Sequence, residues 1–166
     1  NEDISKYLPN DVIDNLIRID YSLFFKLLKA KIMTDDNLQN YVDVDEGIEY
    51  RLKKYVIKAN NLDEFIKLIK TKRYTYNKIN RMFIHILVGF KKSDNLKVID
   101  YTKILGFDKK GLNYLNKIKN SIVIPNGVNT KSNTFKYELQ ASLIYDLINN
   151  TNTFLFELKS KPVIKN

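Results

Sequence analysis

TYNKINRMFIHILVGF, residues 75–90, decides the fold of this chain. Its large apolar residues recur at intervals of three, one, three and four, as Ile79, Met82, Phe83, Ile86 and Phe90. At about 100° per residue these side chains fall within roughly 100° of one another on a helix. A stripe of that width is typical of a helix that buries one face. We therefore expect an amphipathic helix here, with Thr75 as its N-cap.

The residues before this stretch predict further short helices of the same kind. Apolar positions at helical spacing follow Asp45, namely Ile48, Leu52, Tyr55 and Val56. Asn61 and Glu64 match a capping box, in which each side chain accepts a hydrogen bond from a free amide at the helix start. Two earlier apolar stretches, after Pro9 and over residues 23–28, extend the helical pattern toward the N-terminus.

The pattern changes over residues 98–125. Two β-favouring runs flank a stretch with helical spacing: Val98–Ile99 with Tyr101 and Ile104–Leu105, and residues 121–124. A strand, helix, strand unit of that length would be parallel and right-handed. A final long helix is expected over residues 135–148, before an extended tail. The expected fold class is mainly α: one multi-helix domain over residues 1–166 with a small two-stranded parallel β element, the strand–helix–strand unit near 98–125.

The composition excludes several classes of protein. The chain has no cysteine, which rules out disulfides, a thiolate zinc site and a cysteine nucleophile, and indicates a reducing, cytoplasmic location. Its longest apolar runs fall far short of the roughly 20 residues that a membrane span needs, and the acidic N-terminus does not resemble a secretory signal. Because the chain begins at Asn1 without an initiator Met, we expect it to be a piece of a longer protein.

The net charge of +9 is unevenly placed along the chain. Residues 1–64 hold 13 acids against 9 bases, whereas residues 65–166 hold 19 bases against 6 acids. Residues 65–93 contain eight bases and no acid. Such asymmetry indicates a side that faces a polyanion. A bias toward Lys and Asn across a whole genome would also raise the number of bases, so the charge distribution alone leaves both interpretations open.

Residues that could carry catalysis are few. His85 is the only histidine, so the chain holds no histidine pair for zinc and no HxGH-type nucleotide-binding motif. The five glycines are scattered, and no glycine-rich loop can hold a phosphate. The main carboxylate cluster consists of Asp43, Asp45, Glu46 and Glu49. These side chains could bind magnesium. They also suit the N-terminus of a helix, with Asp43 or Asp45 as the cap. We therefore expect no catalytic residue, no cofactor site and no metal site in these 166 residues.

The segment IKTKRYTYNKINR, residues 69–81, is the strongest candidate for a binding site. Basic side chains, threonine hydroxyls and free backbone amides at a helix start can converge on one phosphate. Tyr74 and Tyr76 could stack on an unpaired base, or Tyr76 could belong to the core. The predicted nucleic-acid-binding residues are Lys70, Lys72, Arg73, Tyr74, Thr75, Lys78 and Arg81. The alternatives are a solvated face, an anionic protein partner and a membrane surface.

Four motifs of the chain resemble those in the C-terminal region of the bacterial tRNA(Met) cytidine acetate ligases, a family of predicted nucleotidyltransferases. They are DEGIE at Asp45–Glu49, KTKRYT at Lys70–Thr75, the pair Ile79 and Arg81, and LGFDKKG at Leu105–Gly111. Members of that family usually continue KRYT with two further arginines, and Tyr76 and Lys78 stand in their places here. Lys78 keeps the charge without the bidentate geometry of Arg. The similarity covers nearly all of the chain.

The resemblance implies an enzyme that activates acetate with ATP as acetyl-adenylate and then acetylates the wobble cytidine of elongator tRNA(Met). In that family the chemistry belongs to an N-terminal nucleotidyltransferase-like domain, which carries the HxGH-type motif and binds ATP. The resemblance therefore implies that this chain is the C-terminal domain without the catalytic half, with tRNA and the N-terminal catalytic domain as its partners. The alternative is a non-catalytic scaffold that packs on the catalytic domain, or forms a homodimer, with no direct RNA contact.

Overall fold

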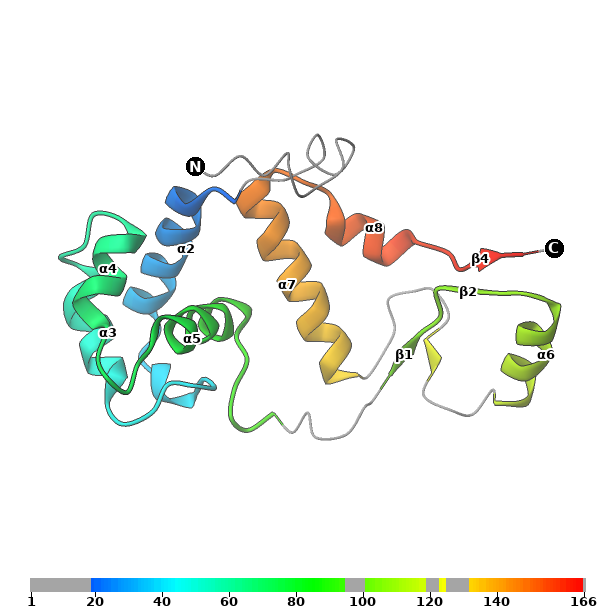
Figure 1. Cartoon of the computed structure of the whole chain (residues 1–166), viewed down its shortest axis with the longest axis horizontal. Coiled ribbons are helices and arrows are strands. Elements are labelled where there is room, and N and C mark those ends of the chain that lie inside the picture. Colours follow the sequence, from blue (N-terminus) through cyan, green and yellow to red (C-terminus); the bar gives the residue numbers. More distant parts are fainter. Residues whose placement is uncertain (1–18, 95–100, 119–122, 125–131, 166) are drawn as a thin grey trace.

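The structure, a computed structural model of the chain, describes residues 19–94, 101–118, 123–124 (backbone only) and 132–165. The helix predicted after Pro9, apart from its last residue, lies outside these ranges, as does the Val98–Ile99 part of the first predicted β run. The described residues form a helical body near the N-terminus, from which a thinner arm of helices and short strands extends (Figure 1). None of the described helices is long and apolar enough to cross a membrane.

Residues 19–94 make up the helical body. Its elements are α2 (Tyr21–Thr34), the 3-10 turn η2 (Leu38–Asn40), α3 (Ile48–Val56), α4 (Leu62–Ile69) and α5 (Tyr76–Val88). The last three are the helices predicted after Asp45, after Asn61 and over residues 75–90. α2 lies against the other three α-helices, and α7 (Asn133–Asn149) returns from the arm to pack along α2 and α5 (Figure 1).

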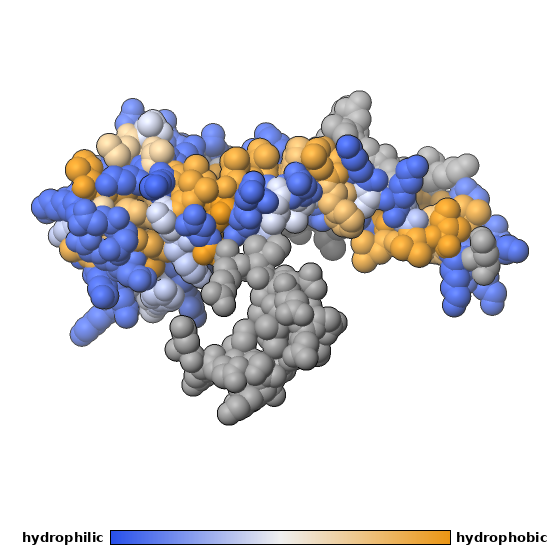
Figure 2. Space-filling model, turned by 90° about the horizontal axis from the view of Figure 1, so that it is seen from above, coloured by the Kyte–Doolittle hydropathy of each residue, from blue (hydrophilic) through white to orange (hydrophobic). Residues whose placement is uncertain are grey.

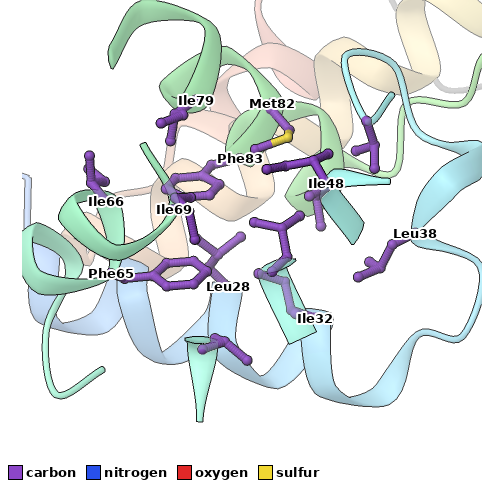
Figure 3. Close-up of a cluster of buried hydrophobic side chains, with 14 of the residues drawn as sticks. Leu28, Ile32, Leu38, Ile48, Phe65, Ile66, Ile69, Ile79, Met82 and Phe83 are labelled. Atoms are coloured by element: carbon purple, nitrogen blue, oxygen red, sulfur yellow. The ribbon is translucent and has the colours of Figure 1, made fainter. Parts of the chain in front are cut away.

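The body closes around one hydrophobic core (Figure 3). Four side chains of α5 are fully buried in it: Ile79, Met82, Phe83 and Ile86. The predicted inward face of this helix is therefore confirmed. The rings of Phe65 and Phe83 stack at 5.4 Å between centroids, which joins α4 to α5. Phe90 is only partly buried, and its ring contacts those of His85 and Tyr137 where the body meets α7.

Local signals set some of the helix ends. Asn61 caps α4 as predicted, because its side chain accepts a hydrogen bond from the amide of Glu64 at 2.9 Å. The carboxylate of Glu64 accepts from the amide of Asn60 at 2.9 Å, so the reciprocal half of the capping box is shifted by one residue. Thr75 occupies the N-cap of α5 but makes no capping hydrogen bond through its side chain. α5 ends at Gly89, whose φ of 79° is the left-handed conformation that glycine adopts readily at a helix C-terminus.

The arm combines helices with two-residue strands whose partners are far apart in sequence. Besides α7 it contains α6 (Lys109–Lys117) and α8 (Thr153–Lys159). β1 (Thr102–Lys103) pairs in parallel with β3 (Val123–Ile124). β2 (Gly106–Phe107) pairs in parallel with β4 (Val163–Ile164), which belongs to the C-terminal tail.

The LGFDKKG motif has a structural explanation in this arm. A Cβ atom on Gly106 would lie 2.9 Å from the carbonyl oxygen of Val163, so only glycine lets the tail approach so closely. Asp108 caps α6 by accepting a hydrogen bond from the amide of Gly111 at 2.8 Å. A Cβ atom on Gly111 would lie 2.9 Å from the Cβ of Phe107. The motif therefore docks the tail and starts α6.

The parallel pair of β1 and β3, with α6 between them in the sequence, corresponds to the expected strand–helix–strand unit. The expectation that this unit is the single β element is wrong. The described residues contain two separate parallel pairs, and the second one includes the tail that the sequence predicts only as extended. Two-residue strands are too short to show an alternating pattern, and the β2–β4 pair joins segments more than 50 positions apart. No local signal could have announced this pairing.

Candidate nucleic-acid interface

The predicted binding segment forms a tight turn between α4 and α5, residues 70–75, which we call the cationic turn. The amide of Tyr74 donates to the hydroxyl of Thr71 at 3.1 Å. The amide of Thr71 donates to the carbonyl oxygen of Tyr74 at 3.3 Å. These two hydrogen bonds close the turn and leave Lys72 and Arg73 at its tip. All three bases of the cationic turn are exposed.

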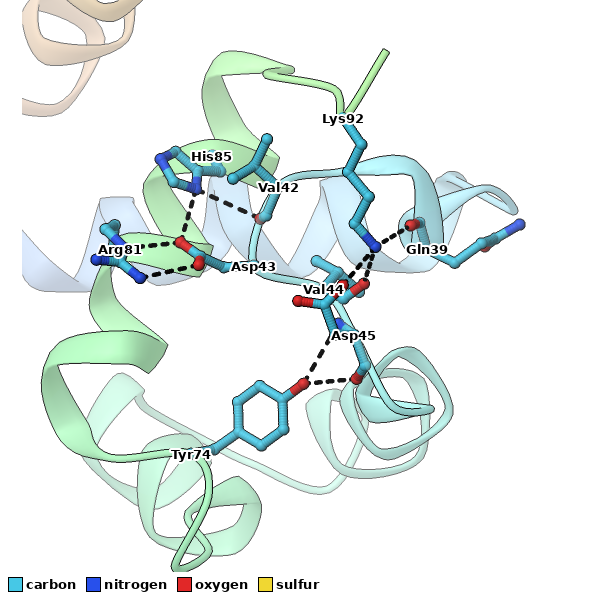
Figure 4. Close-up of polar contacts among 9 residues, drawn as sticks. All are labelled: Gln39, Val42, Asp43, Val44, Asp45, Tyr74, Arg81, His85 and Lys92. Carbon is cyan, nitrogen blue, oxygen red and sulfur yellow. Dashed lines mark hydrogen bonds and ion pairs between the residues drawn. The ribbon is translucent and has the colours of Figure 1, made fainter. Parts of the chain in front are cut away.

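An acidic loop, residues 43–46, lies against α5 and the cationic turn (Figure 4). Its backbone is unusual, because Asp43 and Glu46 adopt positive φ angles of 66° and 53°. Residues with a Cβ atom lose about 1–2 kcal/mol in this left-handed conformation. Contacts with the surrounding residues must therefore hold the loop in place.

Lys92, just after α5, is the main anchor of the acidic loop. Its ammonium group donates to the carbonyl oxygens of Gln39 at 3.0 Å and Val44 at 2.6 Å (Figure 4). The same group lies 2.7 Å from the carboxylate of Asp45. The amide of Lys92 also donates to the carbonyl oxygen of Asn40 at 2.8 Å. Lys92 thus binds the acidic loop through its side chain, and the residues just before the loop through both its side chain and its backbone.

Asp43 pairs with two bases of α5 (Figure 4). Nε of Arg81 donates to Oδ2 of Asp43 at 2.7 Å, and Nη2 donates to Oδ1 at 2.9 Å. Nδ1 of His85 lies 3.0 Å from the same Oδ2 and 3.3 Å from the carbonyl oxygen of Val42. Both neighbours are acceptors, so this nitrogen carries a hydrogen. The hydrogen bonds from Arg81 hold the pKa of Asp43 below its ordinary value although burial opposes them.

The exposure of this pair is strongly asymmetric. The side chain of Asp43 is 14% exposed, whereas that of Arg81 is 63% exposed. The carboxylate therefore lies beneath the guanidinium group, and the guanidinium group faces solvent. Its Nη1 edge makes no hydrogen bond with any of the described residues.

A second carboxylate of the loop pairs with the cationic turn. Nη1 of Arg73 donates to Oε2 of Glu46 at 2.7 Å, and both side chains are more than half exposed. An ion pair so open to water contributes only about 0–1 kcal/mol to stability. Its main effect is to orient the guanidinium group of Arg73.

Tyr74 joins the turn to the loop from below. Its side chain is buried, and burial raises the pKa of its hydroxyl. The hydroxyl donates to the carbonyl oxygen of Asp45 at 2.5 Å (Figure 4). The ammonium group of Lys78 lies over the ring, 4.3 Å from its centroid. A buried ring cannot stack on an RNA base, so that predicted role of Tyr74 is corrected to a supporting one.

Comparison with known proteins shows one family over most of the chain. The family model described as HIGH Nucleotidyl Transferase matches residues 1–158. The tRNA(Met) cytidine acetate ligase of Staphylococcus carnosus is 34% identical over 148 residues. That of Bacillus subtilis is 35% identical over 136 residues. The chain belongs to the HIGH nucleotidyltransferase family.

The chain spans between 32% and 39% of the length of the family members it matches. The alignment covers 82% of this chain and 39% of the S. carnosus protein, and 75% and 32% for the B. subtilis protein. The crystal structure of Thermotoga maritima TmcAL in its apo form has a similar fold, with a TM-score of 0.64 over 84% of this chain and 39% of that chain, at 17% identity. The structure of the same protein bound with alpha-thio ATP gives a TM-score of 0.63.

Membership of the family also corrects the fold class. HIGH nucleotidyltransferases have an α/β fold, whereas the sequence predicts a mainly α domain. The described residues are mostly helical, and their β structure is confined to two short parallel pairs. Helical periodicity therefore dominates the sequence and conceals the class of the family.

The start of α3 differs from the expectation. α3 begins after Gly47, and neither Asp43 nor Asp45 caps it through a side chain. The prediction that they act as caps is wrong. Their carboxylates pair instead with bases after and within α5, which lie 38 or more positions further along the chain.

The structure gathers most of the predicted binding residues around the acidic loop. Arg73, Tyr74 and Arg81 contact it directly, and Lys78 contacts it through the ring of Tyr74. Lys70, Lys72 and Thr75 are exposed, and no partner is found for the two lysines within the described residues. The carboxylates and Lys92 are the part of the arrangement that sequence reasoning missed.

The resulting surface can bind an anion. The guanidinium groups of Arg73 and Arg81 are each held on one side by a carboxylate and open on the other. Beside them stand two lysines, Lys70 and Lys72, that are unpaired as far as the described residues show. Charge-assisted hydrogen bonds from such groups suit phosphate oxygens. No cluster of three metal-ligating side chains occurs in the described ranges.

Proposed function

We propose that this chain is the C-terminal, tRNA-binding part of a cytoplasmic tRNA(Met) cytidine acetate ligase. That enzyme would activate acetate with ATP and transfer the acetyl group to the wobble cytidine of elongator tRNA(Met). Support comes from the 32–35% identity to ligases of that name. The observation that carries RNA binding is the exposed set of bases at the cationic turn and α5, two of which are oriented by carboxylates.

In this proposal the bases bind the tRNA backbone. Lys70 and Lys72 supply charge that follows the phosphates, and Arg73 and Arg81 supply planar groups that bind two oxygens at once. Tyr76 is 50% exposed beside them and is the tyrosine of the segment that could stack on an unpaired base. Contacts of this kind position an RNA without reading its sequence, so selection of tRNA(Met) would need further contacts.

The test is tRNA affinity over a salt series, with the 166-residue chain and its K72A/R73A/R81A variant. Each lost phosphate contact should lower the slope of log Kd against log salt by about 0.7–0.9. The control is K109A/K110A/K117A, which removes three exposed bases from α6 and changes the net charge equally. The proposal requires a flatter slope for the first variant alone. Equal slopes for the two variants would show that the binding is a general effect of charge.

The sequence holds neither an HxGH-type motif nor a glycine-rich loop for the phosphates of ATP. His85 is the single histidine and pairs with Asp43, and the glycines of the LGFDKKG motif serve close packing. We infer that ATP is bound by a nucleotidyltransferase-like domain outside these 166 residues, as the family resemblance implies. Calorimetry should show no ATP binding by the chain and clear binding by the longer ligase. Binding by the chain alone would contradict this division of labour.

A second candidate function is packing against the rest of the longer ligase. Large apolar side chains of the arm are exposed, and apolar surface extends along that side of the molecule (Figure 2). Leu105, Phe156 and Val163 are 69–76% exposed, and the first and last belong to the segments that form the β2–β4 pair. An apolar patch of this kind is typical of an interface, either with the catalytic domain or with a second copy. In the longer ligase, F156D should then loosen the contact between the arm and its partner, the catalytic domain or a second copy. Sedimentation and limited proteolysis would detect this loosening, and I57D on the helical body should not cause it.

A further inference from the structure

The geometry around Arg81 assigns a role to the carboxylate beneath it. We propose that Asp43 is a positioning residue for RNA binding: it holds the guanidinium group of Arg81 so that the free Nη1 edge faces a tRNA phosphate. Glu46 does the same for Arg73. This inference rests on the proposed function, since it explains how the binding surface is kept ready.

The rival interpretation is that Asp43 occupies Arg81 and competes with RNA. The geometry argues against competition. Oδ1 of Asp43 already accepts from Nη2, and Oδ2 accepts from Nε and lies 3.0 Å from Nδ1 of His85. Three donors therefore screen a carboxylate that is 14% exposed, so little of its charge reaches an incoming phosphate.

The acidic loop is also held too firmly to leave its arginines. The amide of Val42 donates to the carbonyl oxygen of Phe90 at 3.1 Å, and Tyr41 forms an antiparallel bridge with Lys91. The Lys92 ammonium and the Tyr74 hydroxyl bind further oxygens of residues 39–45. A competitor must move aside when the ligand binds, whereas a support must stay. A loop fixed at both edges is built as a support.

Positioning matters because a free arginine is costly to order. Its long side chain loses many rotamers when it binds a phosphate, and a guanidinium group that is already oriented loses fewer. The strained backbone at Asp43, with φ of 66°, is what places the carboxylate under Arg81. The strain is thus localised at the residue that orients the binding group.

The two interpretations predict opposite signs for one substitution. D43N makes the chain more positive by one charge, so competition or simple electrostatics predicts tighter tRNA binding. Positioning predicts weaker binding, by about 3- to 10-fold in Kd, and a flatter salt slope because the contact of Arg81 is lost. The matched control is D36N, which removes an equal charge from a side chain that is 91% exposed and paired with Lys53 at 2.9 Å. It should leave Kd unchanged or slightly lower.

A double-mutant cycle with R81A separates this inference from the proposed function. If Asp43 acts through Arg81, D43N/R81A should bind tRNA no more weakly than R81A alone. If R81A itself leaves Kd and salt slope unchanged, the proposed binding surface fails, and this inference fails with it. If R81A weakens binding while D43N tightens it, the surface stands and the positioning role is overturned. Should D43N unfold, as far-UV circular dichroism would show, E46Q at the exposed Arg73 pair carries the same test with the same expected sign.

Discussion

The hydroxyl of Tyr74 donates a hydrogen bond to the carbonyl oxygen of Asp45 at 2.5 Å, across 29 positions of sequence. This bond joins the two family motifs KTKRYT and DEGIE. The ring that carries it also supports the ammonium group of Lys78. The tyrosine of the KRYT sequence is therefore a structural link between the motifs, and the bases around it face outward.

Tyr74→Phe should destabilise the helical body by about 1–2 kcal/mol. The substitution keeps the buried ring and the contact with Lys78 but removes the hydroxyl, which leaves the carbonyl oxygen of Asp45 without this donor. Urea unfolding measures the change. Tyr50→Phe removes a hydroxyl from a side chain that is 76% exposed and should have little effect. Equal stabilities for the two variants would show that the Tyr74 bond does not hold the loop.

Much of the helical body could be predicted from sequence because its signals are local. Ile79, Met82, Phe83 and Ile86 repeat at helical spacing and are fully buried, and Asn61 caps α4 where the capping box indicates. These features depend on residues within one or two turns of one another. The β2–β4 pair could not be predicted in the same way, because its strands are two residues long and lie more than 50 positions apart. The α/β class of the family has no local signal in this mostly helical chain either.

Only half of the candidate site could be predicted, because its bases form a local pattern and their carboxylate partners lie far away in the sequence. An acid-free run of bases is visible in the sequence, so Arg73 and Arg81 stand out. Their partners do not, since Glu46 and Asp43 lie 27 and 38 positions away and suit the start of α3 equally well. The left-handed backbone at Asp43 has no sequence signal, because glycine would be the expected residue there.

Gly106→Ala should release the C-terminal tail. The added methyl group would lie 2.9 Å from the carbonyl oxygen of Val163, closer than a Cβ atom can approach backbone. The amides of Val163 and Lys165 donate to Leu105 and Phe107 at 2.9 and 3.0 Å, so they should lose protection from hydrogen exchange. Amides of α4 in the same sample should keep theirs. Unchanged exchange at both tail positions would contradict the predicted clash.

Acid should detach α8 from α7 through Asp146. Burial alone would raise the pKa of the Asp146 carboxyl group. Hydrogen bonds from Thr151, from Thr153 and from the amide of Phe154 outweigh it and lower this pKa from 3.8 to about 2. A carboxyl group with a lowered pKa stabilises the folded state fully above its ordinary pKa, and this contribution is lost as the pH falls from about 4 to about 2. The amide resonance of Phe154 should therefore titrate in that window in NMR spectra.

The Asp146→Ala variant provides the control for this titration. It should abolish the response of Phe154 and leave the helix start of α8 frayed at every pH. Asp35 provides an internal reference, because its pKa is also lowered to about 2 and its carboxylate accepts a hydrogen bond from the amide of Asn37 at 2.9 Å. The amide resonance of Asn37 should titrate equally in both proteins. A pH response of Phe154 that survives the substitution would assign the transition to a different group.

Lys92→Met should loosen the acidic loop, and Lys91→Met offers a neighbouring control of identical chemistry. The Lys92 ammonium binds two carbonyl oxygens and the carboxylate of Asp45, whereas the Lys91 side chain is exposed and makes no side-chain bond within the described residues. Since Lys92 is 43% exposed, we expect K92M to lower the free energy of unfolding by about 1–2 kcal/mol and K91M by much less.

Both variants lose one positive charge, so general electrostatics weakens their tRNA binding equally. If the loop orients Arg81, K92M must weaken binding further than K91M. Equal affinities would mean that the loop holds its position without Lys92, or that its position does not matter to the RNA, and the unfolding measurement decides between these two.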